Sequence, residues 1–233
     1  MTESPDQNRE FERSRIGSLY QAIMRQVVIR VDAMAASIAE VRTNPAHPNN
    51  WQNAEFCYLQ IRKICEYVAL AVLSAHHEYD DIKTSKIQKQ WNAATLFSQI
   101  GALNRYAFPV PTDIKFDAKG PGCHHVEPAQ VVLEPHDLER IYGQAGDRLH
   151  VGSLKRLVEG KLPPYDFNEL SDWRNRFVKT LNSHMIRLPH VGSVLLVHLK
   201  DESDGDVHCA FGEAEGGFVI GDDPTPFNVE RVT

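Results

Sequence analysis

Apolar residues in the N-terminal part of the chain recur at steps of three or four positions. The series begins with Ile16 and Tyr20 and continues to Val41. This spacing places the apolar side chains on one face of an α-helix, so it predicts one long helix over residues 9–42. Such a helix extends about 50 Å at 1.5 Å per residue. We therefore expect it to lie along a helical bundle or along a partner.

Residues 51–77 predict a second helix that is apolar around most of its circumference. A helical projection leaves only Gln60, Lys63 and Tyr67 for water. This pattern is typical of a central helix that packs on more than one side.

Two opposite charges lie inside this apolar helix. Arg62 and Glu66 are one turn apart, among leucines, on a flank that we expect to be covered. Because a lone buried charge is costly, we expect the two to pair or to meet further polar groups. Two interpretations remain open: a structural ion pair that fixes the register of the bundle, or a charged pocket between helices.

The remaining pattern predicts three more helices and a small β-structure. The helices are expected at about 86–104, about 135–150 and about 166–186, and the proline-rich residues 105–133 are expected to form a long loop. SVLLVHL (193–199) and VHCAF (207–211), separated by a polar turn, predict a hairpin, with a third short strand at 217–220.

The predicted fold is therefore mainly α. Residues 9–188 are expected to form an antiparallel helical bundle, which includes the long N-terminal helix. A small C-terminal β-hairpin or meander with an acidic tail follows over residues 189–233.

Charge is distributed unevenly along the 233 residues. The net charge is −6, but residues 201–233 hold nine acids and one base, Arg231. The last 33 residues thus carry −8 and the first 200 carry +2. The body can meet a polyanion, although it is not basic enough to predict such binding from charge alone.

Several features favour a cytoplasmic protein without membrane contact. No apolar stretch follows a basic start, and the longest apolar run, at 68–73, is too short to cross a bilayer. The cysteines (Cys57, Cys65, Cys123 and Cys209) follow neither a disulfide framework nor a CxxC spacing.

The end of the helix at 135–150 offers candidate chemistry. Asp147, three positions before His150, can orient and charge the imidazole, and Tyr142 lies on the same general side. Gly143 and Gly146 each cost a helix about 1 kcal/mol, which is understandable if another backbone or a ligand approaches there. The alternative is a capping histidine beside a close-packed helix crossing.

Other chemistries have weaker support. Cys123, His124, His125 and His136 could supply zinc ligands, but their spacing matches no standard zinc site. Motifs for nucleotide phosphates, zinc proteases and serine hydrolases are missing from the sequence, so we expect no metal and no cofactor. Arg174, Arg176, Lys179 and Arg187 form a basic face that either meets phosphates or is simply solvated.

Three segments resemble a known family. LQIRKICEYVALA (59–71) resembles the arginine-and-glutamate helix of HEPN-like bacterial proteins, and WNAATLFSQIGALNRYAFPVP (91–111) and YGQAGDRLH (142–150) resemble later segments of that group. The likeness covers about residues 50–155. It implies an α-helical bundle, usually dimeric, and several members act as metal-independent ribonucleases in toxin or phage-defence systems.

This chain departs from the usual signature of the family. That signature is an arginine and a histidine four to six residues apart on one helix. The nearest arginines before His150 are Arg148, two positions away, and Arg140, ten away. A ribonuclease would then need Arg62 to approach His150 from another helix, with His150 as acid/base and Arg62 stabilising phosphate charge.

Two functions are therefore expected from the sequence. The first is an HEPN-like protein that cleaves or binds RNA in a bacterial defence or stress system. Its pocket would be formed by Arg62, Glu66, Tyr142, Asp147 and His150. The second is a non-catalytic oligomeric binding or assembly module with a structural Arg–Glu pair. In either case we expect a homodimer. If the protein is a binding module, we also expect a protein partner to contact the N-terminal helix or the C-terminal hairpin. The third hypothesis, that the protein is a small-molecule or metal enzyme, is supported only by scattered histidines.

Overall fold

The computed structural model describes most of the chain. The described residues are 5–76, 92–93, 95–96, 98–99, 107–116, 123–150, 158–159, 165–188, 193–201, 204–214 and 227–231. Within them lie four long helices: α1 (Pro5–Thr43), α2 (Asn50–Ala75), α5 (Pro135–Leu149) and α7 (Phe167–Leu181). Six strands accompany them: β1 (Val110–Phe116), β2 (Cys123–Pro128), β3 (Ser183–Arg187), β4 (Ser193–His198), β5 (His208–Ala214) and β6 (Phe227–Arg231). The helices hold most of these residues, so the mainly-α class is confirmed.

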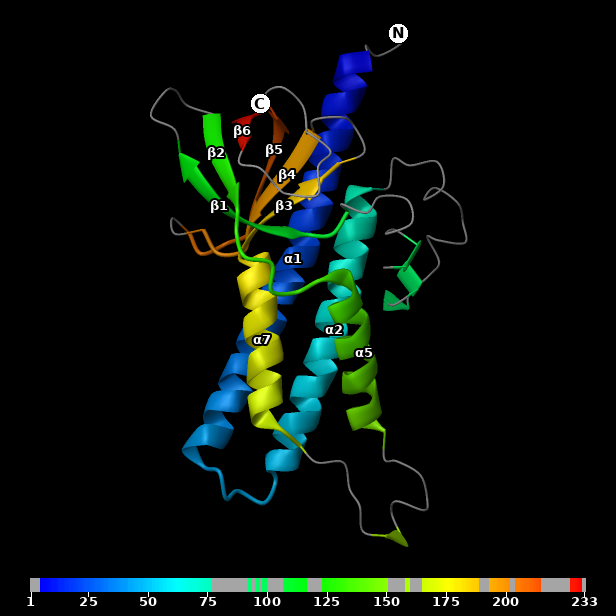
Figure 1. The fold of residues 1–233 in the computed structure, drawn as a ribbon, viewed down its shortest axis with the longest axis vertical. Coiled ribbons are helices and arrows are strands. Elements are labelled where there is room, and N and C mark those ends of the chain that lie inside the picture. The colour runs from blue at the N-terminus through cyan, green and yellow to red at the C-terminus, as the bar shows by residue number, and fades with distance from the viewer. Residues whose placement is uncertain are drawn as a thin grey trace.

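The four helices pack side by side, and α1 extends beyond the others toward the N-terminus. α1 and α2 run antiparallel, and α5 and α7 cover α2 from two directions (Figure 1). Most of the predicted apolar series of α1 is buried, with Tyr20 and Met34 fully enclosed, and Met24 is buried in place of its half-buried neighbour Ile23. Ile61 and Ile64 of α2 meet them in one continuous core.

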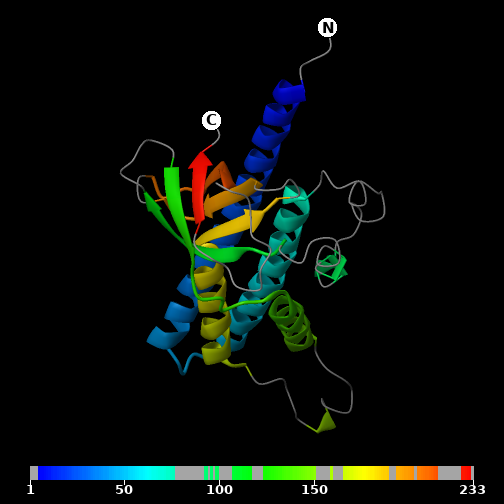
Figure 2. The same ribbon diagram turned by 45° about the horizontal axis from the view of Figure 1, so that its top comes forward.

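The six strands form a closed antiparallel sheet beside the upper part of α1. Their order is β1-β2-β6-β5-β4-β3, and β3 pairs back with β1, so the sheet closes into a small barrel. Figure 2 shows the closed sheet above α7 and against α1. Within the part of the chain that the structure describes, no strand is left with an unpaired edge. Closure of this kind removes the edge as a site for unwanted strand pairing.

β4 is buried on both faces, which explains its continuous apolar run. Val194 and Leu196 belong to a small core with Val126 and Met185, whereas Leu195 and Val197 belong to the core shared with the helices. Alternate residues of a strand point to opposite faces, so the closed sheet uses one face for its interior and the other for the bundle. β4 and β5 pair antiparallel in the segments where the sequence predicts a hairpin, but as part of a larger sheet.

Two predictions about secondary structure are wrong. The expected loop at 105–133 contains β1 and β2, and the expected helix at 166–186 ends at Leu181 and is followed by β3. The prolines of the first segment suggested a loop, but Pro111 stands near the start of β1 and Pro128 ends β2. A missing N–H costs little at the ends of strands. The expected strand at 217–220 and most of the expected helix at 86–104 lie outside the described residues, although 93, 95–96 and 98–99 are helical.

Side-chain contacts join α1 to the closed sheet. Tyr20 and His184 of β3 form a buried hydrogen bond of 2.7 Å, and the ring of Phe211 on β5 lies over Gly17. Arg25 of α1 pairs with Asp206 in the turn between β4 and β5. These contacts couple the helical bundle and the sheet into one packed unit. Among the described residues, no helix is both long enough and apolar enough to span a membrane.

Candidate functional site

The Arg62 side chain leaves α2 and lies across α5. Its Nη2 atom donates a hydrogen bond of 2.9 Å to the hydroxyl of Tyr142, and its guanidinium carbon lies 4.2 Å from the centre of the tyrosine ring. Its Nη1 atom occupies the space that a Cβ atom at position 146 would need. Gly146 is therefore explained by a close approach, but the group that approaches is the side chain of Arg62 and not the backbone or ligand that the sequence predicts. A Cβ atom added at Gly143 would have nothing within 4 Å, so no close approach explains this second glycine.

Glu66 does not pair with Arg62 as expected. Its carboxylate accepts a hydrogen bond of 2.8 Å from Lys63, and within the described part of the chain it forms neither a hydrogen bond nor an ion pair with Arg62. The flank that carries these charges is also more open than predicted, because Leu59 and Leu70 are exposed. Gln60, expected to face water, is instead buried and accepts a hydrogen bond from Arg30.

The other three predicted site residues divide into one buried and two exposed side chains. Tyr142 is buried beneath Arg62; burial raises the pKa of its hydroxyl, and the charge of Arg62 opposes that shift. Asp147 and His150 are exposed, and the described residues provide neither with a hydrogen-bond or ion-pair partner. The structure thus brings Arg62 and Tyr142 together and leaves Asp147 and His150 in solvent.

The point at which Arg62 crosses α5 lies near the end of the helix that carries His150. Arg62 crosses α5 at Gly146, which lies one helical turn, about 6 Å, before His150 at the end of the helix. Arg148, the nearest arginine before His150, lies 3.7 Å from the carboxylate of Glu169 on α7. Tyr58 of α2 also donates to Glu169, and burial raises the pKa of Tyr58 to about 12. Arg148 is therefore engaged in joining three helices.

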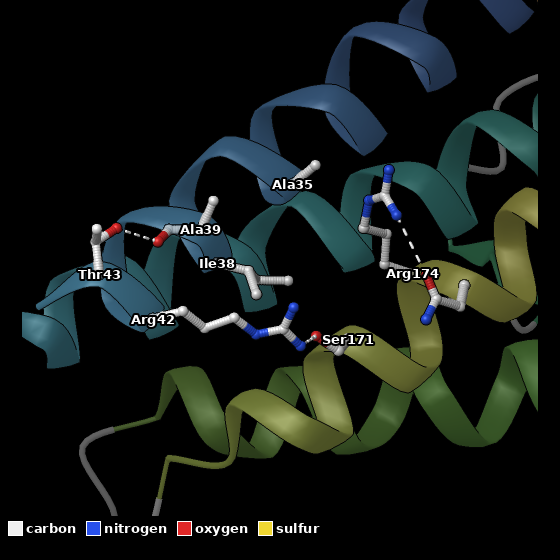
Figure 3. A pocket seen from close by; sticks show the side chains of 8 residues that line it. Ala35, Ile38, Ala39, Arg42, Thr43, Ser171 and Arg174 are labelled. Carbon is white, nitrogen blue, oxygen red and sulfur yellow. Dashed lines mark hydrogen bonds between the residues drawn. The ribbon is translucent and has the colours of Figure 1, made fainter. Parts of the chain in front are cut away.

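A groove between the C-terminal end of α1 and the start of α7 is a second candidate site. Its volume is about 420 Å³. Figure 3 shows Arg42 of α1 extending toward Ser171 and Arg174 coming from α7, with the apolar side chains of α1 beside them. The groove is lined by Ala35, Ile38, Ala39, Arg42, Thr43, Ser171, Arg174 and Asn175.

Neither arginine of this groove has a carboxylate partner among the described residues. Arg42 donates to the hydroxyl of Ser171 at 3.0 Å. Arg174 donates through Nε to the carbonyl oxygen of Val31 at 3.1 Å and through Nη1 to the side chain of Asn175 at 3.2 Å. Both guanidinium groups retain N–H donors beyond these bonds. The groove can therefore bind an anion.

The sequence pointed to only part of this groove. Arg174 belongs to the basic face noted on the helix at 166–186, but Arg176 of that face pairs with Asp137. Arg42 was not predicted, because 132 positions separate it from Arg174 and no local pattern links them. An arginine in the last turn of a long helix is an ordinary helix-end feature.

The predicted alternative of a zinc site gains no support. His136 is exposed beside Glu134, and Cys123, His124 and His125 lie on β2 rather than in a loop. Asp201, Asp204 and His208 gather at the turn before β5, where His208 already contacts Asp204 at 2.9 Å. Exposed acidic groups of this kind are common at turns.

Comparisons of this chain with protein-family models, with curated proteins and with solved structures give no match. The resemblance to HEPN-like proteins therefore remains a prediction from the sequence.

Proposed function

We propose that the protein binds a phosphate-bearing ligand, with RNA as the expected class, in the groove between α1 and α7. The observation that carries this proposal is that Arg42 and Arg174 both reach an open groove without a carboxylate partner among the described residues. Three other arginines do have such partners: Arg25 contacts Asp206, and Arg140 and Arg176 contact Asp137. Arg62 bonds to Tyr142 instead, and it does not line this groove.

The chemistry of the groove suits phosphate. A guanidinium group presents planar N–H donors whose spacing matches two phosphate oxygens, and it keeps its charge at any physiological pH. Ser171 and Asn175 add neutral hydrogen-bonding groups beside the two charges. On the α1 side of the groove, Ala35 and Ala39 have only methyl side chains, so a ligand can approach this helix closely.

The lining favours backbone contacts over base recognition. It contains no aromatic side chain on which a base could stack. Contacts to phosphate position a nucleic acid but carry no direct sequence information. We therefore propose binding with little sequence preference, and the resemblance to HEPN-like proteins supports RNA as the ligand and a bacterial defence or stress context.

Fluorescence anisotropy with a labelled single-stranded RNA tests this proposal. Arg42→Gln and Arg174→Gln should each weaken binding by about tenfold to 150-fold, because a hydrogen bond to a charged group contributes about 1.5–3 kcal/mol. Arg140→Gln is the matched control: it removes the same charge from an exposed arginine of α5 that contacts Asp137. Equal affinities for the wild type and both groove variants would refute the assignment of the groove.

RNA cleavage is a second candidate function, favoured by one specific observation. Arg62 crosses α5 one turn before His150 and has no carboxylate partner among the described residues. In this proposal His150 exchanges protons with the reacting groups, and Arg62 stabilises charge on the phosphate. Tyr142 would hold the guanidinium in place, while Glu66 and Asp147 would contribute only long-range charge.

A cleavage assay with purified protein and single-stranded RNA distinguishes this second function from binding alone. His150→Ala should abolish cleavage without changing the fold, because the side chain is exposed. His136→Ala, an exposed histidine at the other end of α5, is the control and should keep full activity. Cleavage that survives His150→Ala undiminished would exclude the residue from the mechanism. If the wild type does not cleave RNA, the cleavage hypothesis is excluded and the hypothesis of a non-catalytic binding module remains.

A further inference from the structure

One side of α2 carries a stripe of exposed and half-buried side chains with the spacing of a coiled coil, and its last member, Leu73, also packs against the core. Successive members of the stripe are separated by three, four, three, four and three positions. They are Phe56, Leu59, Lys63, Glu66, Leu70 and Leu73. Phe56, Leu59 and Leu70 are 41%, 45% and 39% exposed although they are large and apolar. The other sides of α2 pack on α1, α5 and α7, so this α2 stripe is the side without a partner among the described residues.

The pattern of apolar and charged positions in the α2 stripe is the same in both directions, while the two charges exchange places. Two apolar residues stand at each end, and the Lys63–Glu66 ion pair of 2.8 Å lies in the middle. If a second copy of the helix runs antiparallel to the first, Phe56 faces Leu73 of the second copy. In the same register Leu59 faces Leu70 of the second copy, and Lys63 faces its Glu66. Every apolar residue then meets an apolar residue of the other copy. By symmetry, the pairing of Lys63 with Glu66 of the other copy occurs twice.

We propose that the α2 stripe is the interface at which two copies of this chain form a two-fold symmetric, antiparallel dimer. An isologous interface of this type needs a self-complementary surface, and the α2 stripe is one. In heptad terms Phe56, Lys63 and Leu70 fall at one core position and Leu59, Glu66 and Leu73 at the other. Antiparallel coiled coils pack one kind of core position against the other.

The charges select the antiparallel orientation over the parallel one. A parallel pair would place Lys63 against Lys63 of the second copy and Glu66 against its Glu66. Like charges in one interface are unfavourable, and they act against that orientation. A different protein would need the same alternation of apolar and charged groups, whereas a second copy has it by symmetry.

The size of the α2 stripe sets the expected strength of the dimer. From Phe56 to Leu73 the helix rises about 26 Å, and a helix is about 10 Å wide, so the stripe covers about 260 Å². A standard stable interface buries about 800 Å² per partner. We therefore expect a reversible dimer with a dissociation constant in the micromolar range or above.

Sedimentation velocity from about 1 µM to about 1 mM measures this equilibrium. The wild type should shift from monomer to dimer within that range, and Leu59→Ser combined with Leu70→Ser should remain monomeric. Ile29→Ser is the control, because Ile29 is 57% exposed on α1, outside the stripe, and should leave the equilibrium unchanged. A wild type that stays monomeric, or a Leu59→Ser/Leu70→Ser variant that dimerises like the wild type, overturns the proposal.

Charge exchange and cross-linking test the orientation. Lys63→Glu should weaken the dimer about tenfold, and adding Glu66→Lys should restore it, because the exchanged charges again meet their opposites. A chain with both Leu59→Cys and Leu70→Cys should form disulfide-linked dimers joined between positions 59 and 70. Either substitution alone should not give such a dimer. Cross-links that join 59 to 59 or 70 to 70 would overturn the antiparallel register.

Discussion

Replacing Gly146 by alanine tests whether the Arg62 side chain occupies the surface of α5. The Cβ atom added at position 146 would overlap Nη1 of Arg62, so the guanidinium group must move away. It would then lose its hydrogen bond to Tyr142 and its place over the tyrosine ring. Gly143→Ala on the same helix is the matched control, because an added Cβ there has nothing within 4 Å.

The expected magnitudes follow from three contributions. Alanine is favoured over glycine inside a helix by about 1 kcal/mol, and this gain applies at both positions. Losing the hydrogen bond costs about 0.5–1.5 kcal/mol, and losing the cation–π contact costs about 0.5–1 kcal/mol. Gly143→Ala should therefore raise the free energy of unfolding by about 1 kcal/mol. Gly146→Ala should leave it unchanged or lower it by up to about 1.5 kcal/mol.

Urea unfolding followed by circular dichroism measures the difference. The gap between the two variants should be about 1–2.5 kcal/mol, and for a chain of this size each kcal/mol corresponds to about 2–4 °C in Tm. Repeating Gly146→Ala in an Arg62→Ala background completes a double-mutant cycle. In that background the alanine should stabilise by about 1 kcal/mol, because nothing remains for its Cβ to displace. Equal stabilisation by Gly143→Ala and Gly146→Ala in the wild-type background would refute the reasoning.

Three further predictions concern the closed sheet and its contacts with α1. Burial lowers the pKa of His184 from 6.5 to about 4. As the pH falls, this histidine is therefore protonated in the unfolded chain at a higher pH than in the folded protein. The free energy of unfolding should therefore fall by about 3 kcal/mol between pH 6.5 and pH 4, and His184→Gln should remove that part of the slope in urea titrations at several pH values. Gly205→Ala should cost about 1 kcal/mol in thermal unfolding, because Gly205 has a φ of 72° that side chains rarely adopt. Gly17→Leu should cost about 1–3 kcal/mol by the same measurement, because its side chain would meet the ring of Phe211; an unchanged Tm would argue against that contact.

Local patterns predicted α1, α2 and the start of α5 well. The steps of three and four from Ile16 to Val41 correspond to the buried face of α1, because a periodic apolar face is itself the cause of packing. Pro135 begins α5, and the backbone N–H of Glu134 donates to Asp137. Such helix starts can be predicted from the sequence because the residues that stabilise them lie within one turn of each other.

Strands near prolines were harder to predict. Val110, Thr112, Ile114 and Phe116 alternate with other residues at the period of a strand, but the neighbouring prolines suggested a loop instead. What makes this segment a strand is its pairing with β2 and with β3, which lies about 70 positions later. Pairing over such a distance leaves no local signal.

Partners across the fold could not be predicted from spacing. Glu66 is one turn from Arg62, but Tyr142, 80 positions later, receives the hydrogen bond. The leucines at 59 and 70 looked like core residues, but they are exposed, because an exposed apolar side chain has the same sequence signature as one in a core. The groove between Arg42 and Arg174 exists only because α1 ends beside the start of α7.

The salt dependence of RNA binding tests most directly the central claim that Arg42 and Arg174 contact phosphate. On a single strand, the logarithm of the association constant falls with the logarithm of salt concentration by a slope of about 0.7 for each phosphate contact. Arg42→Gln combined with Arg174→Gln should therefore reduce the slope by about 1.4, and Arg140→Gln should leave it unchanged. A double variant with the slope and affinity of the wild type would contradict the claim.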